Sequence, residues 1–151
     1  MSRNGDGGGG RVNEHEIMRV SDILALQSMK ATYCELVDEC VRNGKKSAER
    51  LSELFTEDVQ ADYGMGPLNG RSAVVEFLGA LSATNESLWH SIHTPRIQVT
   101  GDTAVGAWTL IVRTKQKGSA TPDTLFGRYL DEFRRTPQGW RISSVRFLQE
   151  G

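Results

Sequence analysis

The sequence predicts an α+β domain in which N-terminal helices pack on a strongly curved antiparallel sheet. Up to about residue 82, apolar residues recur at helical spacing. From residue 90 onward the spacing changes, and four strand-like runs follow one another with short connections. Strands joined so closely pair antiparallel, and helices followed by such a meander are typical of the α+β class.

The first expected helix covers residues 21–43. Ser21 suits an N-cap, and Asn43 with the following glycine ends the helical pattern. Projected at 100° per residue, one wide arc of this helix is apolar. The residues on that arc are Ile23, Leu26, Met29, Tyr33, Leu36, Val37, Cys40 and Val41.

Two shorter helices are expected over 47–55 and 71–82, with a short strand ending at Tyr63 between them. A glycine and an aspartate at positions 101 and 102 form a tight turn between the first two long strands, and residues 136–139 join the last two. The four long strands are expected over 90–100, 103–116, 124–135 and 140–149.

Apolar residues occupy both faces of the expected sheet. Trp108, Leu110 and Val112 lie on one face, whereas Val105 and Ile111 lie on the other. A sheet with helices on one face should be polar on the other, so the second face is expected to be covered by a partner subunit. The sequence therefore predicts a homo-oligomer, either a homo-trimer or a homo-dimer.

Composition excludes several classes of protein. The chain has 151 residues and a net charge of −1, so we expect no binding to nucleic acid or to an anionic membrane surface. No apolar run approaches the roughly 20 residues that a membrane-spanning helix needs, and no secretory signal is visible. We expect a flexible glycine-rich tail over 1–12 and a single domain over 13–151.

The two cysteines give no sign of a disulfide or a metal site. Cys34 and Cys40 are six residues apart in one expected helix, which is about 9 Å of axial rise and too far for a disulfide. A reducing cytoplasm is therefore the expected compartment. Neither a CxxC nor an HExxH pattern occurs, so no metal is expected.

The stretch over 87–97 is the first candidate for acid/base chemistry. It carries His90 and His93, two of the three histidines. Imidazole exchanges protons near neutral pH because its unperturbed pKa is about 6.5. Its natural partner is Asp38, which falls at the border of the apolar arc, where a carboxylate faces either a cavity or solvent. A histidine on an apolar strand is also often an ordinary core or surface residue.

The order of these parts resembles the SnoaL-like branch of the NTF2-like superfamily. The resemblance rests on Tyr-x4-Asp in the first helix, on a histidine entering the first long strand, and on the motifs GDTAxGxW and GxYxDEFxRTxxGWRI. It covers about residues 15–149. Within that branch the chain is most similar to the bile-acid 7α-dehydratase and hexachlorocyclohexane dehydrochlorinase group, with scytalone dehydratase more distant. The resemblance implies a cone of helices and curved sheet around a pocket.

The resemblance places the family's Asp–His dyad on Asp38 and His90. His93 is the second choice for the base, because a one-residue slip turns a side chain to the opposite face. The pocket tyrosine of the family falls on Tyr33, five residues before Asp38, and Tyr33 is therefore the third expected catalytic residue. The resemblance and the local sequence give four further candidates for contact with the substrate, namely Tyr63, Tyr129, Arg146 and His93.

These residue types suit proton abstraction next to a carbonyl. A neutral imidazole removes the proton, and a carboxylate on its other nitrogen fixes the tautomer. A tyrosine hydroxyl can hold the developing oxyanion in a water-poor cavity. The resemblance thus implies a dehydratase, isomerase or related lyase that acts on a hydrophobic small molecule, and its steps require no metal or organic cofactor.

Other interpretations remain open at this point. In a non-catalytic binding or accessory module of the same fold, Asp38 and His90 would lie more than about 5 Å apart. An epoxide hydrolase would need Asp62 and Asp131 to converge on a water with Arg128 or Arg146. Tyr33 could also be ordinary core packing, and Arg146 could simply pair with Asp131 or with its neighbour Glu132.

Overall fold

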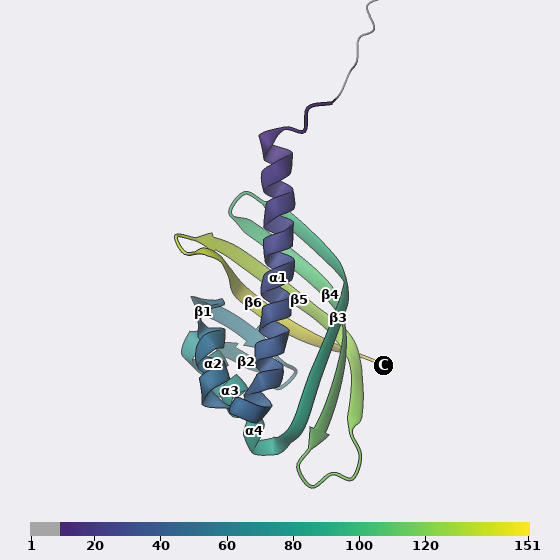
Figure 1. Cartoon of the computed structure of the whole chain (residues 1–151). Coiled ribbons are helices and arrows are strands. Elements are labelled where there is room, and N and C mark those ends of the chain that lie inside the picture. The colour runs from purple at the N-terminus through teal and green to yellow at the C-terminus, as the bar shows by residue number, and fades with distance from the viewer. Residues whose placement is uncertain (1–9) are drawn as a thin grey trace, which may run out of the picture.

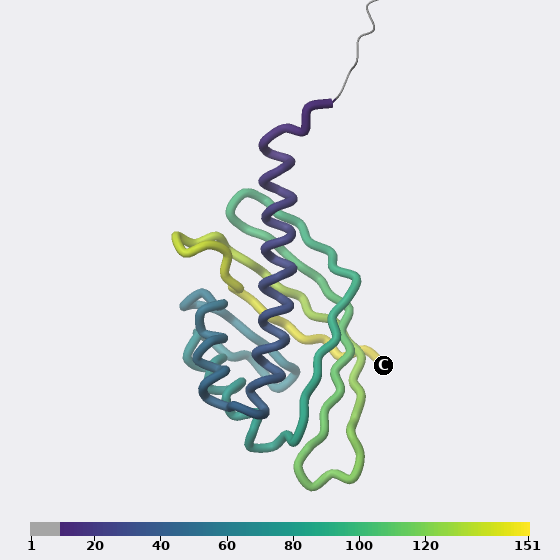
Figure 2. The backbone as a smooth tube through the Cα atoms, in the orientation of Figure 1, coloured from purple at the N-terminus to yellow at the C-terminus, as the bar shows by residue number. Residues whose placement is uncertain are grey.

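A six-stranded sheet with helices on one of its faces forms the part of the protein that the computed structural model describes, residues 10–151. The long helix α1 lies across this face of the sheet, and the shorter helices gather at one end (Figures 1 and 2). The predicted α+β class and the wrapping of the sheet around the helices are therefore confirmed. Most of the expected tail over 1–12 lies outside the described residues.

Helix α1 spans Glu14–Asn43 and begins earlier than the expected start at Ser21. The reason is a capping box upstream: the Asn13 side chain accepts from the backbone N–H of Glu16 at 2.9 Å, and the Glu16 carboxylate accepts from the backbone N–H of Asn13. The helix ends at Gly44, whose φ of +50° suits a residue without a Cβ.

The shorter helices differ from expectation at their ends. The helix expected over 47–55 stops early because Phe55 begins a strand, and the helix expected over 71–82 breaks at Ala80. The helices concerned are α2 (Lys45–Ser52), α3 (Arg71–Gly79) and α4 (Leu81–Thr84).

The sheet is mixed rather than wholly antiparallel. Its strands follow the order β2-β1-β6-β5-β4-β3, and β1 runs parallel to β6, whereas the other neighbours are antiparallel. The predicted antiparallel meander is confirmed for β3 to β6, and β1 adds a parallel pairing because it joins β6 through the helices and the whole meander, so no tight hairpin fixes its direction. The strands are β1 (Phe55–Asp62), β2 (Pro67–Asn69), β3 (Asn85–Thr100), β4 (Thr103–Gln116), β5 (Asp123–Thr136) and β6 (Gly139–Glu150).

A bulge in β3 contributes to the curvature of the sheet. The register with β4 shifts between His93 and Arg96, and Thr94 takes a φ of +48° just before Pro95. The extra residue bends the strand and increases its twist. A second shift, next to Phe133, lies between β5 and β6. The bent sheet therefore curls toward α1.

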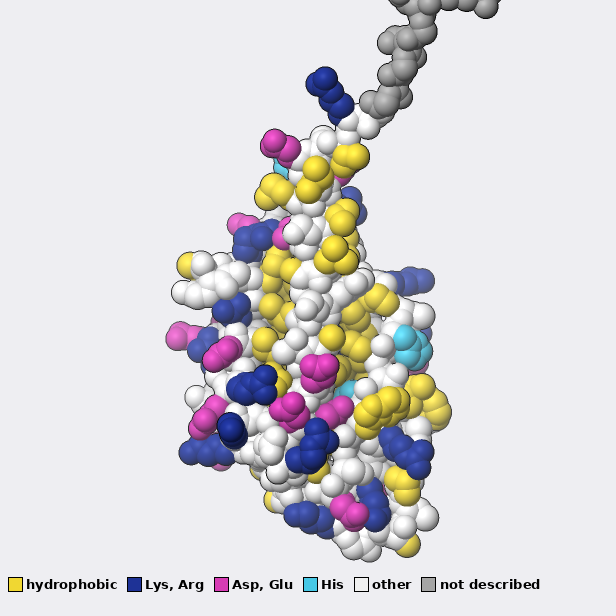
Figure 3. Space-filling model, viewed as in Figure 1, with side chains coloured by type: hydrophobic (Ala, Val, Ile, Leu, Met, Phe, Trp, Pro, Cys, Tyr) yellow, Lys and Arg dark blue, Asp and Glu magenta, His cyan; other side chains and the backbone are white. Residues whose placement is uncertain are grey.

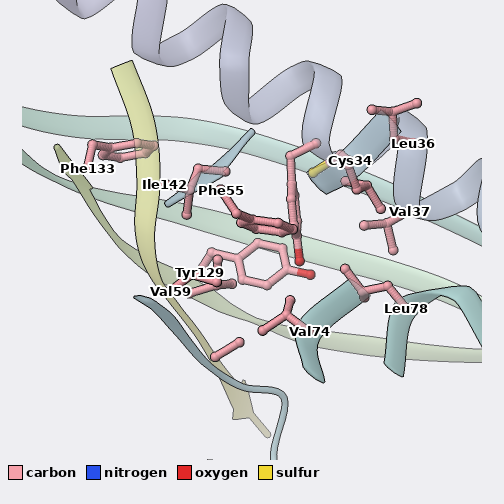
Figure 4. Packing of buried hydrophobic residues seen from close by; sticks show 14 of the residues in the cluster. Cys34, Leu36, Val37, Phe55, Val59, Val74, Leu78, Tyr129, Phe133 and Ile142 are labelled. Atoms are coloured by element: carbon pink, nitrogen blue, oxygen red, sulfur yellow. The ribbon is translucent and has the colours of Figure 1, made fainter. Parts of the chain in front are cut away.

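The core lies between α1 and the concave face of the sheet. Figure 4 shows Tyr129 of β5 among Phe55, Val59 and Val74, with Cys34 of α1 above them. The arc expected to be apolar is buried from Leu26 to Val41, which confirms the phase of the helix. Each large apolar side chain in this cluster stabilises the fold by roughly 1.5–3 kcal/mol.

The beginning of α1 extends past the sheet (Figure 1). Exposed apolar side chains cover it in Figure 3, and they come from Ile17, Met18, Val20 and Leu24. In the described part of the chain, no helix is both long enough and apolar enough to cross a membrane.

Replacing Gly127 with alanine is expected to lower the free energy of unfolding by about 1–3 kcal/mol, the usual cost of overpacking. A Cβ at this position in β5 would collide with the carbonyl oxygen of Leu148 and with the ring of Phe147. Chemical denaturation of Gly127→Ala measures the loss. Gly118→Ala is not a suitable comparison because that glycine has a positive φ, so Gly10→Ala, where an added Cβ meets no atom within 4 Å, is the control and should leave the midpoint unchanged. An unchanged midpoint for Gly127→Ala would contradict this packing argument.

Candidate active site

Asp38 and His90 meet in a hydrogen bond between α1 and β3. The carboxylate Oδ1 lies 2.6 Å from the ring Nδ1 of His90, and Oδ2 accepts the backbone N–H of His90 at 3.0 Å. The two side chains are 15% and 5% exposed, respectively. Because the carboxylate binds both the ring and the backbone of the same residue, it fixes the orientation of the imidazole.

The other ring nitrogen of His90 faces Tyr129. The distance from Nε2 to the Tyr129 hydroxyl is 3.2 Å. If Nδ1 carries the proton that binds Asp38, Nε2 has a free lone pair and accepts from the tyrosine. This tautomer is the one that a general base needs.

His90 and Tyr129 both line a cavity of about 200 Å³, which lies between the helices and the concave face of the sheet. Its walls are mainly apolar and come from Val37, Met65, Phe77, Leu78, Leu81, Leu88, Val112, Leu125 and Phe147. Its polar groups are few and come from Tyr63, Asn85, His90, Thr114 and Tyr129. An apolar cavity with a few polar groups is the usual form of a small-molecule site.

All three tyrosines of the chain gather at this cavity. Tyr63 and Tyr129 line it, whereas Tyr33 lies behind the wall and its hydroxyl is 2.9 Å from that of Tyr63. Burial raises the pKa of Tyr33 and Tyr129 well above the ordinary value and also raises that of Tyr63. The three hydroxyls therefore keep their protons at neutral pH and can act as donors.

Two expected substrate-binding residues lie away from this cavity. His93 is exposed because its side chain points to the opposite face of β3 from the side chains of Leu88 and His90. Arg146 is exposed on β6, between the inward-facing Val145 and Phe147. The prediction that His93 and Arg146 lie at the substrate cavity was wrong, because successive side chains of a strand point to opposite faces of the sheet.

Arg146 instead borders a hollow of about 500 Å³ on the outer face of the sheet, together with Arg96 and Glu132. This hollow is larger than the cavity beside His90. It holds neither member of the Asp–His pair, so its size does not make it the site of acid/base chemistry. The Asp–His pair also borders a hollow of about 530 Å³ between α1 and β3, which the described residues line partly with charged side chains and with no tyrosine. The cavity lined by both His90 and Tyr129 therefore remains the candidate active site.

Sequence reasoning missed a buried ion pair behind the tyrosines. Lys30 lies at the centre of the buried arc of α1, and its ammonium is 2.9 Å from the carboxylate of Asp131. Asp131 also accepts from the indole N–H of Trp108 at 2.7 Å. The signal was present in the sequence, since Lys30 follows Leu26 by four residues and precedes Tyr33 by three.

The same pair removes the basis for an epoxide-hydrolase site. Asp131 binds Lys30, Asp62 accepts the backbone N–H of Gly64, and Arg128 pairs with Glu150. These groups do not converge on one point. Within residues 10–151, no cluster of three or more His, Cys, Asp and Glu side chains could hold a metal ion.

Residues 18–146 match the family described as the SnoaL-like domain. Among curated proteins, an uncharacterised protein of Mycobacterium tuberculosis is 26% identical over 129 residues, which are 83% of this chain and 84% of that protein. The family match covers most of the chain and includes Asp38, His90 and all three tyrosines.

Solved structures share the fold. An NTF2-like superfamily protein from Salmonella enterica superposes with a TM-score of 0.78 at 18% identity, covering 88% of this chain and 94% of that one. The hexachlorocyclohexane dehydrochlorinase LinA-type3 from Novosphingobium barchaimii gives 0.77 at 16% identity, covering 90% and 91%. At such identities the likeness concerns the fold alone.

Proposed function

This chain belongs to the SnoaL-like family within the NTF2-like superfamily, and we propose that it is an acid/base enzyme, a dehydratase, isomerase or related lyase. The observation that carries the proposal is the hydrogen bond between Asp38 and His90, in which the imidazole of His90 lines an apolar cavity and its Nε2 contacts Tyr129 of the same cavity. A buried carboxylate–imidazole pair of this kind is the arrangement of a general base with its orienting group.

In the proposed reaction, His90 Nε2 removes a proton from the carbon next to a carbonyl group. Asp38 stabilises the imidazolium that forms. The Tyr129 hydroxyl, which binds Nε2 in the free protein at 3.2 Å, would then turn its proton to the developing oxyanion. Tyr63 is a second donor within the cavity, and Tyr33 holds the Tyr63 hydroxyl from behind. These steps use only side chains of this chain.

The cavity supports an uncharged, mostly apolar substrate. Among residues 10–151, no arginine or lysine lines it, so a carboxylate or phosphate group would find no Arg or Lys cation to neutralise its charge there. A volume of about 200 Å³ fits one or two fused rings. Because Arg146 lies outside this cavity, polar atoms of the substrate would be bound by the hydroxyl and amide groups of Tyr63, Asn85, Thr114 and Tyr129.

Exchange of α-protons tests this proposal without the natural substrate. The bicyclic ketone 2-tetralone in D₂O should exchange its α-protons faster with the protein than without it, as followed by proton NMR. If 2-tetralone binds in the cavity but its exchange is not accelerated, the alternative of a non-catalytic module for small apolar ligands is favoured.

We also propose that a second copy of the chain covers the outer face of the sheet. Ile111 and Phe126 are cross-strand neighbours there, and Trp89 and Leu148 extend the apolar surface to the flanking strands. Trp89 and Phe126 are 57% and 56% exposed in the single chain, which is unusual for large aromatic side chains.

Phe126→Glu is therefore expected to shift the protein from a dimer or trimer to a monomer. A carboxylate at the centre of an apolar interface would have to be buried without a partner. Light scattering coupled to size-exclusion chromatography measures the mass. Lys46→Gln, on the exposed side of α2, lowers the net charge by the same one unit and should leave the mass unchanged. A Phe126→Glu protein with the wild-type mass would argue against this interface.

A further inference from the structure

The buried ammonium of Lys30 lies in the corner between two tyrosine rings. Its Nζ is 3.7 Å from the ring centroid of Tyr129 and 4.1 Å from that of Tyr33. The two rings are almost perpendicular, at 88°, with centroids 5.9 Å apart. The remaining direction of the ammonium is taken by Asp131 at 2.9 Å. The surroundings of the Lys30 ammonium thus consist of one carboxylate and two aromatic faces.

These two rings carry hydroxyls of the candidate active site. The Tyr129 hydroxyl binds His90 Nε2, and the Tyr33 hydroxyl binds that of Tyr63. Lys30 itself does not line the cavity. An interaction that fixes the rings of Tyr33 and Tyr129 therefore also fixes their hydroxyl groups, although Lys30 contacts neither the cavity nor His90.

Stability alone does not account for an ion pair at this point. Both side chains are fully buried, and the removal of two charges from water is so costly that a well-packed apolar pair of similar volume is often as stable. The surrounding wall is apolar and needs no charge. What a leucine or methionine could not provide is attraction to two ring faces at once, in a geometry that Asp131 and Trp108 hold.

We propose that Lys30, held by Asp131, is a positioning residue that aligns the Tyr129 hydroxyl in the cavity and the Tyr33 hydroxyl that holds Tyr63 from behind. The cation also draws electron density from both rings, which strengthens their hydroxyls as hydrogen-bond donors. This role rests on the proposed function, because donors need alignment only where a ligand oxygen is to be bound.

The test variant removes both charges of the Lys30–Asp131 ion pair and keeps the approximate shape of the two side chains. In Lys30→Met/Asp131→Asn, methionine replaces the lysine stem, and the asparagine oxygen still accepts from Trp108. A matched control exists about two turns earlier in α1, where Asp22 binds both Arg135 and the indole of Trp140. The control variant Asp22→Asn/Arg135→Met removes a second ion pair between helix and sheet, far from the tyrosines.

Two measurements separate positioning from mere structural support. The chain has only three tyrosines, so fluorine NMR of 3-fluorotyrosine protein reports this cluster alone. The signals of Tyr33 and Tyr129 should move in the Lys30 double variant and stay in place in the control. Binding of 2-naphthol, whose hydroxyl stands in for a substrate oxygen, should weaken about tenfold, while binding of naphthalene stays unchanged.

Unchanged fluorine signals, or equal losses for 2-naphthol and naphthalene, would overturn the proposal. If the double variant does not fold, an NMR measurement on the wild-type protein replaces it. The Lys30 ammonium protons should show NOEs to the rings of Tyr33 and Tyr129. The absence of these NOEs would also overturn the proposal. Neither measurement depends on turnover. Failure of α-proton exchange would therefore count against the proposed function and leave this result intact.

Discussion

Asp38→Asn is expected to lower the protein-dependent exchange of 2-tetralone α-protons by roughly two to four orders of magnitude, the usual contribution of a positioned acid/base group. Asparagine keeps the shape of aspartate, but it cannot stabilise an imidazolium. Its amide would also compete as a donor toward His90 Nδ1, so that Nε2 becomes protonated and the base is lost. His90→Ala should cause a loss of the same size because it removes the base itself.

Each of these substitutions has a matched control in its own element. Glu39, next to Asp38 in α1, binds Ser47 and Arg50 at the surface, so Glu39→Gln should keep wild-type exchange. His93 lies three residues after His90 on the opposite face of β3, and His93→Ala should also keep it. Far-UV circular dichroism should confirm that all four variants are folded. Retained exchange in Asp38→Asn or His90→Ala would eliminate the dyad as the source of catalysis.

Local periodicity was enough to predict most of the fold. The meander after residue 90 has alternating strands with short turns, and its observed strand ends differ from expectation by only a few residues. The early start of α1 at Glu14 was missed because the Ser21 signal was preferred over the Asn13–Glu16 capping box. The parallel pairing of β1 with β6 depends on how the helices return the chain to the sheet, which no local pattern encodes.

The contact between helix α1 and strand β3 at the candidate site could be predicted from the sequence. The face of the sheet to which a residue of a single strand points was harder to predict. Asp38 and His90 meet as the family pattern implied, but the parity of β3 and β6 placed His93 and Arg146 on the outer face. Lys30 was overlooked because a charged residue on an apolar arc was not expected to be buried. Its partner Asp131 also points inward, because it shares the buried face of β5 with Tyr129 and Phe133, two residues before and after it.

Lys30→Met alone is expected to lower the free energy of unfolding by about 3–5 kcal/mol at neutral pH, far more than the Lys30→Met/Asp131→Asn double variant. The single substitution leaves the Asp131 carboxylate buried with only Trp108 as a donor. Burial already raises the pKa of Asp131, and Lys30 opposes that rise in the wild-type protein. Without the ammonium the pKa of Asp131 rises further. Urea denaturation of the three proteins measures the difference.

The loss of stability in the Lys30→Met protein should increase as the pH rises from about 4 toward neutral. The unfolded chain releases the Asp131 proton near the ordinary pKa of 3.8, whereas the folded Lys30→Met protein holds it to a higher pH. In that window the folded variant binds more protons than the unfolded chain, so its stability falls as pH rises, by up to about 1.4 kcal/mol per pH unit. The deficit relative to wild type should therefore be small near pH 4 and grow toward neutral pH. A deficit of equal size at every pH would mean that lost packing of the lysine stem, rather than the unpaired carboxylate, destabilises the variant.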